Sequence, residues 1–343
     1  MTRWPSAVAV ACVALATLLP GSPASAKAVD VTVDAVALGD SYASGVGAGT
    51  ETDGECRRTP GAYAAQWSQL DPDAVKLEVN ACSGATTLDV RKNQLGELGQ
   101  DTDLVTLQVG VNDLELITTL ESCADPGQTK DCEARLEALP ALSAALPAEL
   151  SRLVDTIKDK APKAKVALVG YPLPFTPECP KLPLPAKALA GGNAAIAGLN
   201  QLYLELAAIK GAVYVDVAKP FQGHEVCGNA SWLVGAEGVP NRTVLHPTLE
   251  GQTKGYLTAL VTTVGAPDKV LEWMLLRDTP RPSAEPSTGP SSSAAPGAGG
   301  SAGGLPLTGP NVWWLILVAT VLVGGGAATY MTLRPKVIRV TSD

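Results

Sequence analysis

The chain has 343 residues and carries 26 Lys and Arg side chains against 34 Asp and Glu, which gives a formal net charge of −8. This acidic balance, without a basic cluster that could neutralise phosphates, argues against nucleic acid as a partner. In an exported domain, an excess of acidic side chains favours solubility.

The first 26 residues, 1–26, have the pattern of a secretory signal peptide. Arg3 supplies the positive start, Ala7–Leu19 is an apolar stretch, and Ala24-Ser25-Ala26 matches an A-x-A cleavage site. The mature chain is therefore expected to begin at Lys27, in an oxidising compartment outside the cytoplasm.

Residues 27–278 are long enough for one sizeable domain. Five short apolar runs predict buried strands at Val31–Leu38, Val75–Asn80, Leu104–Val109, Lys165–Val169 and Val213–Val217. Helical patterns lie between or after them at Tyr63–Leu70, Thr87–Leu98, Glu133–Lys160, Ala186–Ile209 and Tyr256–Val264. This alternation predicts an α/β fold with a central parallel sheet of about five strands, covered by helices on both faces.

The helical segment Glu133–Lys160 contains Pro140 and Pro147. Proline has no N–H to donate, and its ring clashes with the carbonyl four residues earlier. We therefore expect both prolines to break this segment.

Four short motifs carry side chains suited to chemistry: Gly39-Asp40-Ser41-Tyr42, Cys82-Ser83-Gly84-Ala85-Thr86, Gly110-Val111-Asn112-Asp113 and Leu245-His246-Pro247. The first three follow directly on predicted strands. Because ligands bind at the carboxyl ends of parallel strands, the topology alone predicts that Ser41, Gly84 and Asn112 meet. A serine, a histidine and two further hydrogen-bond donors are the components of acyl transfer through a covalent serine ester.

The order and context of these motifs resemble the SGNH (GDSL) hydrolase superfamily. The resemblance implies a three-layer α/β/α, flavodoxin-like fold, with Ser41 as nucleophile and His246 as base. It also implies an oxyanion hole formed by the main-chain N–H groups of Ser41 and Gly84 and the side-chain amide of Asn112. Donors of this kind are worth about 3 kcal/mol each when removed singly.

Each of these residues also has a structural explanation. Ser41 and Asn112 could cap helices, and Gly84 could serve a tight turn, although these roles are compatible with catalysis. His224 is the only other histidine, in a loop beside Cys227, where a structural or pocket-wall role is favoured. His246 is preferred as the base because a proline and then a helix follow it.

One position departs from the superfamily pattern. The usual acid stands three residues before the histidine, where this chain has Thr243. Some group must still fix the imidazole tautomer that accepts the serine proton. Our hypothesis is a Ser41–His246 dyad with the Thr243 main-chain oxygen as the orienting group, and Asp216 is the alternative. Losing the carboxylate is expected to weaken catalysis without abolishing it.

The surroundings of these motifs are less defined. We interpret Asp40 and Asp113 as loop braces that hydrogen-bond nearby backbone. The segments Tyr171–Phe175 and Leu182–Leu189 are apolar and rich in proline. They could line a groove for the acyl chain or serve ordinary packing, and the sequence favours neither.

Six cysteines remain after removal of the signal peptide, and six allow fifteen pairings. Resemblance to secreted actinobacterial SGNH esterases implies pairing of neighbours along the chain: Cys56–Cys82, Cys123–Cys132 and Cys179–Cys227. A metal site is disfavoured because C-x-x-C spacing and nearby histidines are lacking. We expect no metal or organic cofactor.

The C-terminal part has three sections. Residues 279–304 are rich in Pro, Ser, Ala and Gly and are expected to form an extended linker. Residues 305–343 contain Leu305-Pro306-Leu307-Thr308-Gly309, an apolar run over Val312–Leu333 that is long enough for a transmembrane helix, and a basic tail. This combination resembles the cell-wall sorting signal of Gram-positive bacteria, in which a sortase cleaves between threonine and glycine, here Thr308 and Gly309. A plain membrane anchor is the alternative.

Together these features predict an exported, surface-anchored serine esterase or lipase, which acts as a monomer on a lipid or acylated carbohydrate ester. Its other partners would be a sortase and the cell wall or membrane. The alternatives are a polysaccharide or cell-wall O-deacetylase of the same fold, an acyltransferase, and a non-catalytic surface binding module.

Overall fold

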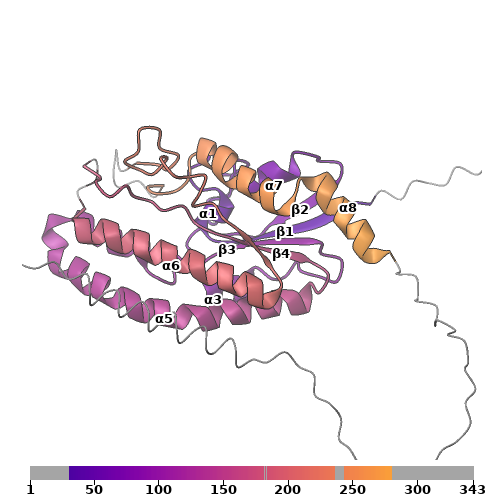
Figure 1. The fold of residues 1–343 in the computed structure, drawn as a ribbon, viewed down its shortest axis with the longest axis horizontal. Helices are drawn as coiled ribbons and strands as arrows, with labels where there is room; N and C mark the ends of the chain where they lie inside the picture. Colours follow the sequence, from indigo (N-terminus) through magenta and orange to yellow (C-terminus); the bar gives the residue numbers. More distant parts are fainter. Residues whose placement is uncertain (1–30, 181, 183, 236–242, 280–343) are drawn as a thin grey trace, which may run out of the picture. The chain divides into compact units, whose positions relative to one another are not determined.

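The computed structural model describes residues 31–279 apart from 181, 183 and 236–242 (Figure 1). The expected signal peptide, the linker and sorting signal, and the apolar run 312–333 lie outside the described residues. Among the described helices, none is long and apolar enough to cross a membrane. The same part of the chain contains no group of three or more His, Cys, Asp or Glu residues placed to hold a metal ion.

Five parallel strands form one sheet in the order β2-β1-β3-β4-β5. The strands are β1 (Val33–Gly39), β2 (Val75–Val79), β3 (Leu104–Gln108), β4 (Lys165–Val169) and β5 (Val213–Val215). Strand β3 lies at the centre and is buried at every position, as expected for a strand covered on both faces. All five predicted strands are present, and the α/β fold with its parallel sheet is confirmed.

The helices cover both faces of the sheet. They are α1 (Ser41–Ser44), α2 (Tyr63–Ser68), α3 (Thr87–Asn93), α4 (Leu116–Ala124), a 3₁₀ turn η1 (Pro126–Gln128), α5 (Thr129–Lys160), α6 (Ala186–Lys210), a π-helix η2 (Gly251–Leu257), α7 (Thr258–Val264) and α8 (Pro267–Asp278). Helices α3, α4, α5 and α6 pack on one another on one side, and α2, η2 and α7 pack on one another on the other (Figure 1). The result is a three-layer α/β/α arrangement.

The prediction that two prolines break the long helix is wrong. Helix α5 runs without interruption through Pro140 and Pro147. Both prolines are exposed, whereas Leu139, Leu146 and Leu150 on the same helix are buried. The missing hydrogen bonds therefore fall on the solvent side, where water serves the free carbonyls, and packing of the leucine stripe keeps the helix together.

The predicted disulfide pairing is confirmed, with bonds Cys56–Cys82, Cys123–Cys132 and Cys179–Cys227. Cys123 lies in α4 and Cys132 in α5, so this bond joins two consecutive helices. Each bond links neighbours in the cysteine order, and none spans more than 48 residues. Three disulfides in one domain are typical of an exported protein.

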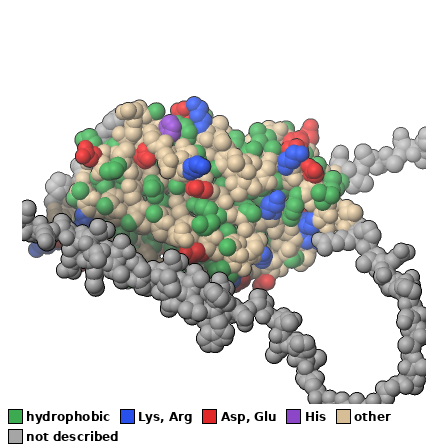
Figure 2. Space-filling model, viewed as in Figure 1, with side chains coloured by type: hydrophobic (Ala, Val, Ile, Leu, Met, Phe, Trp, Pro, Cys, Tyr) green, Lys and Arg blue, Asp and Glu red, His purple; other side chains and the backbone are tan. Residues whose placement is uncertain are grey.

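The surface shows no segregation of charge on the face drawn in Figure 2, where acidic and basic side chains are interspersed with apolar ones. The larger exposed apolar side chains are Val31, Leu70, Leu88, Leu204, Ile209, Leu249, Leu275 and Leu276. They belong to several different elements, and scattered exposure of this kind is normal for a folded domain.

Because Pro147 lies in a helix on the solvent side, Pro147→Ala should restore a main-chain donor and remove the clash with the preceding turn. We expect the free energy of unfolding to rise by about 1–3 kcal/mol, measured by guanidinium chloride denaturation. The control is Pro185→Ala at the start of α6, where φ is −65° and suits proline, so no gain is expected. A Pro147→Ala variant less stable than the wild type would contradict this account.

Candidate active site

The serine of the first motif sits at the carboxyl end of β1, at the first turn of α1. Gly39 ends the strand with φ of 142°, and a Cβ placed there would lie 2.0 Å from the Gln108 carbonyl oxygen on β3. Only glycine permits this close approach. Asp40 then caps α1, because its Oδ1 accepts a hydrogen bond from the Tyr42 N–H at 3.0 Å. Ser41 follows as the first residue of the helix.

Ser41 and His246 meet in the structure. His246 Nε2 lies 2.7 Å from Ser41 Oγ, and each residue is only 6% exposed. Residues 243–247, the histidine loop, are held by main-chain hydrogen bonds to Val234. Leu245 N–H donates to Val234 O at 2.9 Å, and Val234 N–H donates to His246 O at 2.8 Å. The arrangement is the one required for a histidine that removes the serine proton.

Main-chain carbonyls of two successive residues, the predicted Thr243 and the next residue Val244, act on the imidazole of His246. His246 Nδ1 lies 3.1 Å from Val244 O, whereas Thr243 O accepts the main-chain N–H of His246 at 3.0 Å. The Thr243 oxygen thus serves the histidine backbone and also acts on the imidazole. With Nδ1–H donating to Val244, Nε2 is left to accept the serine proton.

Burial lowers the pKa of His246 from 6.5 to about 4. The carbonyls of Val244 and Thr243 act in the opposite direction, and the positive charge of Arg57 adds to the lowering. The imidazole is therefore neutral near pH 7, which is the form that a general base requires.

The loop after β2 is braced on both sides of Gly84. Ser83 N–H donates to Cys56 O at 3.0 Å, and Ala85 N–H donates to Cys82 O at 3.1 Å, so the disulfide partners also fix the loop backbone. Gly84 itself is exposed and has φ of 83°, a conformation that favours glycine. The glycine thus has the turn role that the sequence allowed, in a loop next to a disulfide.

Asn112 reaches this same loop from the carboxyl end of β3. Its Nδ2 donates to Ala85 O at 2.9 Å, one residue after Gly84. The neighbouring Asp113 accepts hydrogen bonds from both the N–H and the hydroxyl of Thr87, at 3.0 and 2.6 Å. Asp113 therefore braces the start of α3, as predicted, and the two residues join the loops that follow β2 and β3.

Asp40 braces more than its own helix. Its Oδ2 accepts a 2.6 Å hydrogen bond from the Tyr171 hydroxyl, which follows β4. Complete burial raises the pKa of Asp40 to about 7, although the Tyr171 and Tyr42 hydrogen bonds work in the opposite direction. The sequence identified Asp40 as a brace but gave no signal for its tyrosine partner, because the two residues are 131 positions apart.

The alternative base, His224, and the alternative orienting acid, Asp216, both have other hydrogen-bond partners. His224 stacks on Trp232 with ring centroids 3.6 Å apart, and its Nδ1 lies 2.6 Å from Ala230 O. Asp216 accepts a hydrogen bond from Ala218 N–H at 3.0 Å. Both side chains thus serve local structure in their own loops.

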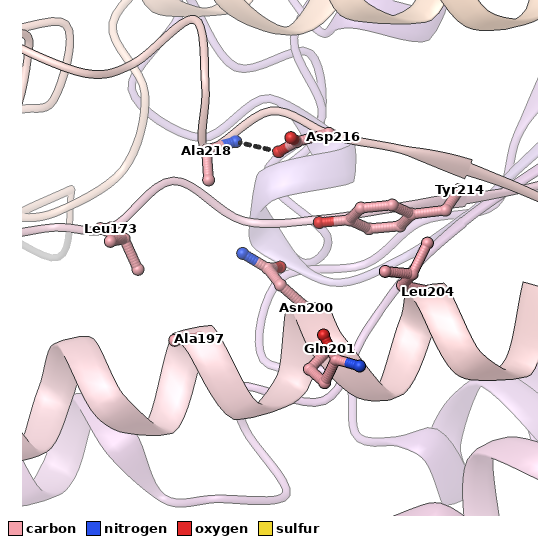
Figure 3. Close-up of a pocket in the computed structure, with 8 residues that line it drawn as sticks. All are labelled: Leu173, Ala197, Asn200, Gln201, Leu204, Tyr214, Asp216 and Ala218. Carbon is pink, nitrogen blue, oxygen red and sulfur yellow. Dashed lines mark hydrogen bonds between the residues drawn. The ribbon is translucent and has the colours of Figure 1, made fainter. Parts of the chain in front are cut away.

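The apolar segments after β4 divide between packing and surface. Tyr171, Phe175, Leu182 and Leu189 are buried in the core. Leu173 lines a hollow of about 230 Å³ between α6 and the chain around β5 (Figure 3). The other lining residues are Ala197, Asn200, Gln201, Leu204, Tyr214, Asp216 and Ala218. Neither Ser41 nor His246 lines this hollow, which therefore gives no evidence for an acyl groove at the serine.

Comparison with known proteins places this geometry in a family. The GDSL-like Lipase/Acylhydrolase family matches residues 37–254, which include Ser41 and His246. The chain belongs to this family. It is therefore a carboxylic ester hydrolase by family, as the sequence predicted.

Several of the relatives are named lipases of streptomycetes. The chain is 38% identical to a lipase of Streptomyces rimosus over 252 residues, 72% of this chain and 92% of the relative. The crystal structure of that organism's extracellular lipase matches with a TM-score of 0.63 and covers 67% of this chain and 99% of its own. A phospholipase A1 of Streptomyces albidoflavus matches with 37% identity and the same TM-score, and covers 68% and 99% of the two chains.

Because burial lowers the pKa of His246 to about 4, the neutral base should persist well below pH 6. We expect the acid limb of kcat/KM on a short soluble ester to have its midpoint near 4, since activity requires the deprotonated imidazole. Rapid assays from pH 3.5 to 8 would measure it. The control is Asp40→Asn, which removes the buried carboxyl group next to Ser41, and an acid limb that persists in this variant is assigned to His246. A midpoint near 6.5 would contradict burial as the controlling factor.

Proposed function

We propose that this protein hydrolyses carboxylic esters through an acyl-serine intermediate formed on Ser41, with His246 as the general base. Ser41 Oγ attacks the ester carbonyl while His246 Nε2 takes its proton. The imidazolium then protonates the departing alcohol, and the acyl group remains on Ser41. In the second half, His246 removes a proton from the water that attacks the acyl carbon. The imidazolium then returns a proton to Ser41 Oγ as the bond to the acyl carbon breaks, which releases the carboxylic acid and restores the free serine.

The observation that carries this proposal is the 2.7 Å contact between His246 Nε2 and Ser41 Oγ. A serine hydroxyl is inert near neutral pH unless a base is within hydrogen-bond reach. The family match over both residues supports the same roles. The missing carboxylate implies a dyad, in which the Val244 carbonyl takes the place of the acid at Nδ1.

We propose that the main-chain N–H groups of Ser41 and Gly84 and the side-chain amide of Asn112 donate hydrogen bonds to the oxyanion. The three residues follow β1, β2 and β3, whose carboxyl ends meet at one edge of the sheet. The hydrogen bond from Asn112 to Ala85 supports this assignment, because it brings the amide to the Gly84 loop. Donors fixed in advance stabilise the charge that develops on the substrate oxygen.

As substrate we propose a lipid or simple acyl ester, because a relative matched over most of its own length is named a lipase and another is named phospholipase A1. We further propose that the domain acts outside the cell, fixed to the surface through Leu305–Gly309 and the apolar run that follows. Surface attachment also suits an O-deacetylase acting on cell-wall or plant polysaccharide, which is the second candidate.

Ser41→Ala should abolish hydrolysis of nitrophenyl esters, with kcat reduced by at least about 10⁴-fold because the nucleophile is lost. The assay compares wild type and variant on esters from acetyl to palmitoyl, after circular dichroism shows equal folding. An optimum at long chains supports a lipase, and activity confined to acetyl esters supports the deacetylase. Equal rates for both proteins on every ester would leave a binding module as the better account.

Sortase processing should leave Thr308 as the last residue of the protein chain, joined to cell-wall material. Mass spectrometry of the C-terminal peptide, released from walls of a Gram-positive host by a muralytic enzyme, would detect it. The matched control is Thr308→Ala, which should leave the protein uncleaved and membrane-bound. A wild-type chain that still carries residues 310–343 would show that the segment is a plain membrane anchor.

A further inference from the structure

The histidine loop contains a residue in an unfavourable backbone conformation. Leu245, directly before His246, has φ of 66°, in the left-handed region that residues with a Cβ disfavour. Arg57, Glu115 and Leu245 are the non-glycine residues with positive φ among those described. The direction in which the chain enters His246 depends on this angle, so contacts around Leu245 must maintain it.

Tyr42, the residue after the nucleophile, contacts this loop through its hydroxyl and its ring. Tyr42 Oη donates to Leu245 O at 2.9 Å, and its ring centroid lies 5.1 Å from the His246 imidazole. Tyr42 is 6% exposed, so the hydrogen bond forms away from solvent. A single side chain therefore links the helix that bears Ser41 to the residue that precedes the base.

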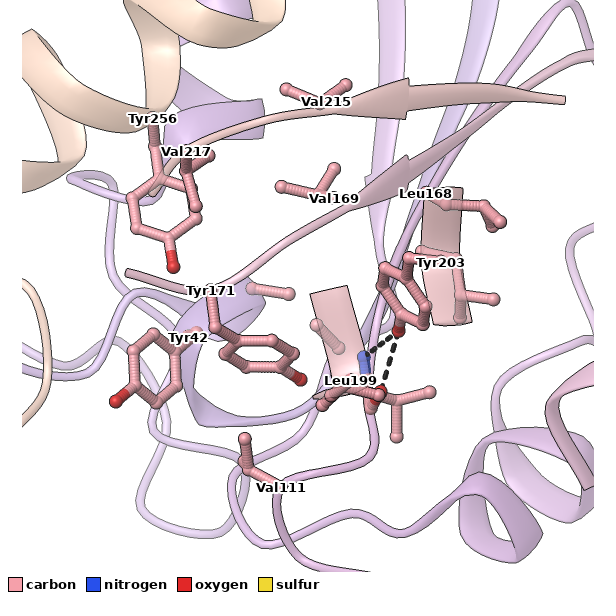
Figure 4. Packing of buried hydrophobic residues seen from close by; sticks show 14 of the residues in the cluster. Tyr42, Val111, Leu168, Val169, Tyr171, Leu199, Tyr203, Val215, Val217 and Tyr256 are labelled. Atoms are coloured by element: carbon pink, nitrogen blue, oxygen red, sulfur yellow. Dashed lines mark hydrogen bonds between the residues drawn. The ribbon is translucent and has the colours of Figure 1, made fainter. Parts of the chain in front are cut away.

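Tyr42 is itself fixed from several directions. Its N–H donates to Asp40, and its carbonyl oxygen accepts from Gln252 Nε2 at 2.9 Å. Its ring meets Tyr171 edge-on, with centroids 5.1 Å apart (Figure 4). Gln252 is completely buried and belongs to the π-helix η2, a type of helix that often occurs at functional sites. The side chain is thus a rigid point from which the loop can be held.

We propose that Tyr42 is the positioning residue for the catalytic base, because its hydroxyl holds Leu245 in the left-handed conformation that aims His246 Nε2 at Ser41 Oγ. This inference rests on the proposed Ser41–His246 dyad. In a triad, a carboxylate fixes the imidazole; here the group at Nδ1 is the Val244 carbonyl, which belongs to the same loop. Holding the loop therefore also holds the orienting group.

Tyr42 acts in this role as a permanent donor. Burial, with a contribution from Asp40, raises the pKa of Tyr42, so the phenol stays protonated throughout the range in which the enzyme works. No proton is transferred through it. The effect of the hydroxyl passes through the backbone of Leu245, whereas the ring contacts His246 directly. Removing the hydroxyl alone therefore separates this role from packing of the ring.

The test is a mutational cycle on the full chain, with kcat and KM measured on a short soluble nitrophenyl ester. Tyr42→Phe keeps the ring and removes only the hydroxyl, and should lower kcat about tenfold with little change in KM, as expected for one buried hydrogen bond. The same change is then made in Leu245→Ala and Leu245→Gly backgrounds. Both substitutions remove the leucine side chain beyond Cβ, but only glycine also removes the steric cost of a positive φ at this position.

We expect the tenfold loss to persist with alanine at position 245 and to shrink below about threefold with glycine, since the strain that the hydroxyl opposes is then gone. An equal loss in all three backgrounds, or no loss with Leu245 present, would overturn the proposal. Tyr63→Phe is the matched control. Tyr63 is also buried, and among the described residues no hydrogen bond joins its hydroxyl to the histidine loop. The kcat of the Tyr63→Phe variant should therefore stay within about twofold of wild type.

A second measurement does not depend on activity. The chain has only two histidines, so selective ¹⁵N-histidine labelling gives signals for His246 and His224 alone. Tyr42→Phe should shift or broaden the His246 signals and leave those of His224, which stacks on Trp232, unchanged. Unchanged His246 signals would overturn the inference. If the wild type had no Ser41-dependent activity, the proposed function would fail, and this spectrum would still decide the role of Tyr42.

Discussion

The proposed chemistry depends on one hydrogen bond, between Ser41 Oγ and His246 Nε2, which joins residues 205 positions apart. Of these two residues, the parallel sheet positions only Ser41, because Ser41 follows β1 directly. His246 comes after the last strand and is placed by loop contacts, including the isolated bridge between Leu233 and Pro247. Ser41 is therefore positioned by the sheet, whereas His246 is positioned by its loop and by the side chains that contact the loop.

Without a carboxylate at Nδ1, burial controls the protonation state of His246. A carboxylate at Nδ1 would raise the pKa of the imidazole and stabilise its charged form. In this chain, burial keeps His246 neutral and ready to accept a proton, while two carbonyl dipoles, from Val244 and Thr243, oppose the lowering. In the mechanism that we propose, the imidazolium would be stabilised by dipoles and not by a full charge. Its stabilisation would therefore be weaker than in a triad.

Much of the fold could be predicted from the sequence because its signals are local. Apolar β-branched runs identified all five strands, and the motifs at three strand ends predicted the edge of the sheet where the site lies.

Features that depend on distant contacts could not be predicted. The continuity of α5 through Pro140 and Pro147 depends on which face the prolines occupy. The 3.1 Å contact between His246 Nδ1 and Val244 O depends on the turn in the loop. The Tyr42–Leu245 contact spans 203 positions and has no local signature.

The two buried titratable groups of the site affect stability in opposite directions as pH changes. The pKa of His246 is lowered from 6.5 to about 4, so the unfolded chain binds a proton first, and stability is lost as pH falls through that range. The pKa of Asp40 is raised from 3.8 to about 7, so the folded chain holds a proton that the unfolded chain releases, and stability is gained as pH falls. The two pH ranges overlap, and the two contributions oppose each other within them. A buried base and a buried acid in one site therefore counteract each other's effect on stability as pH falls.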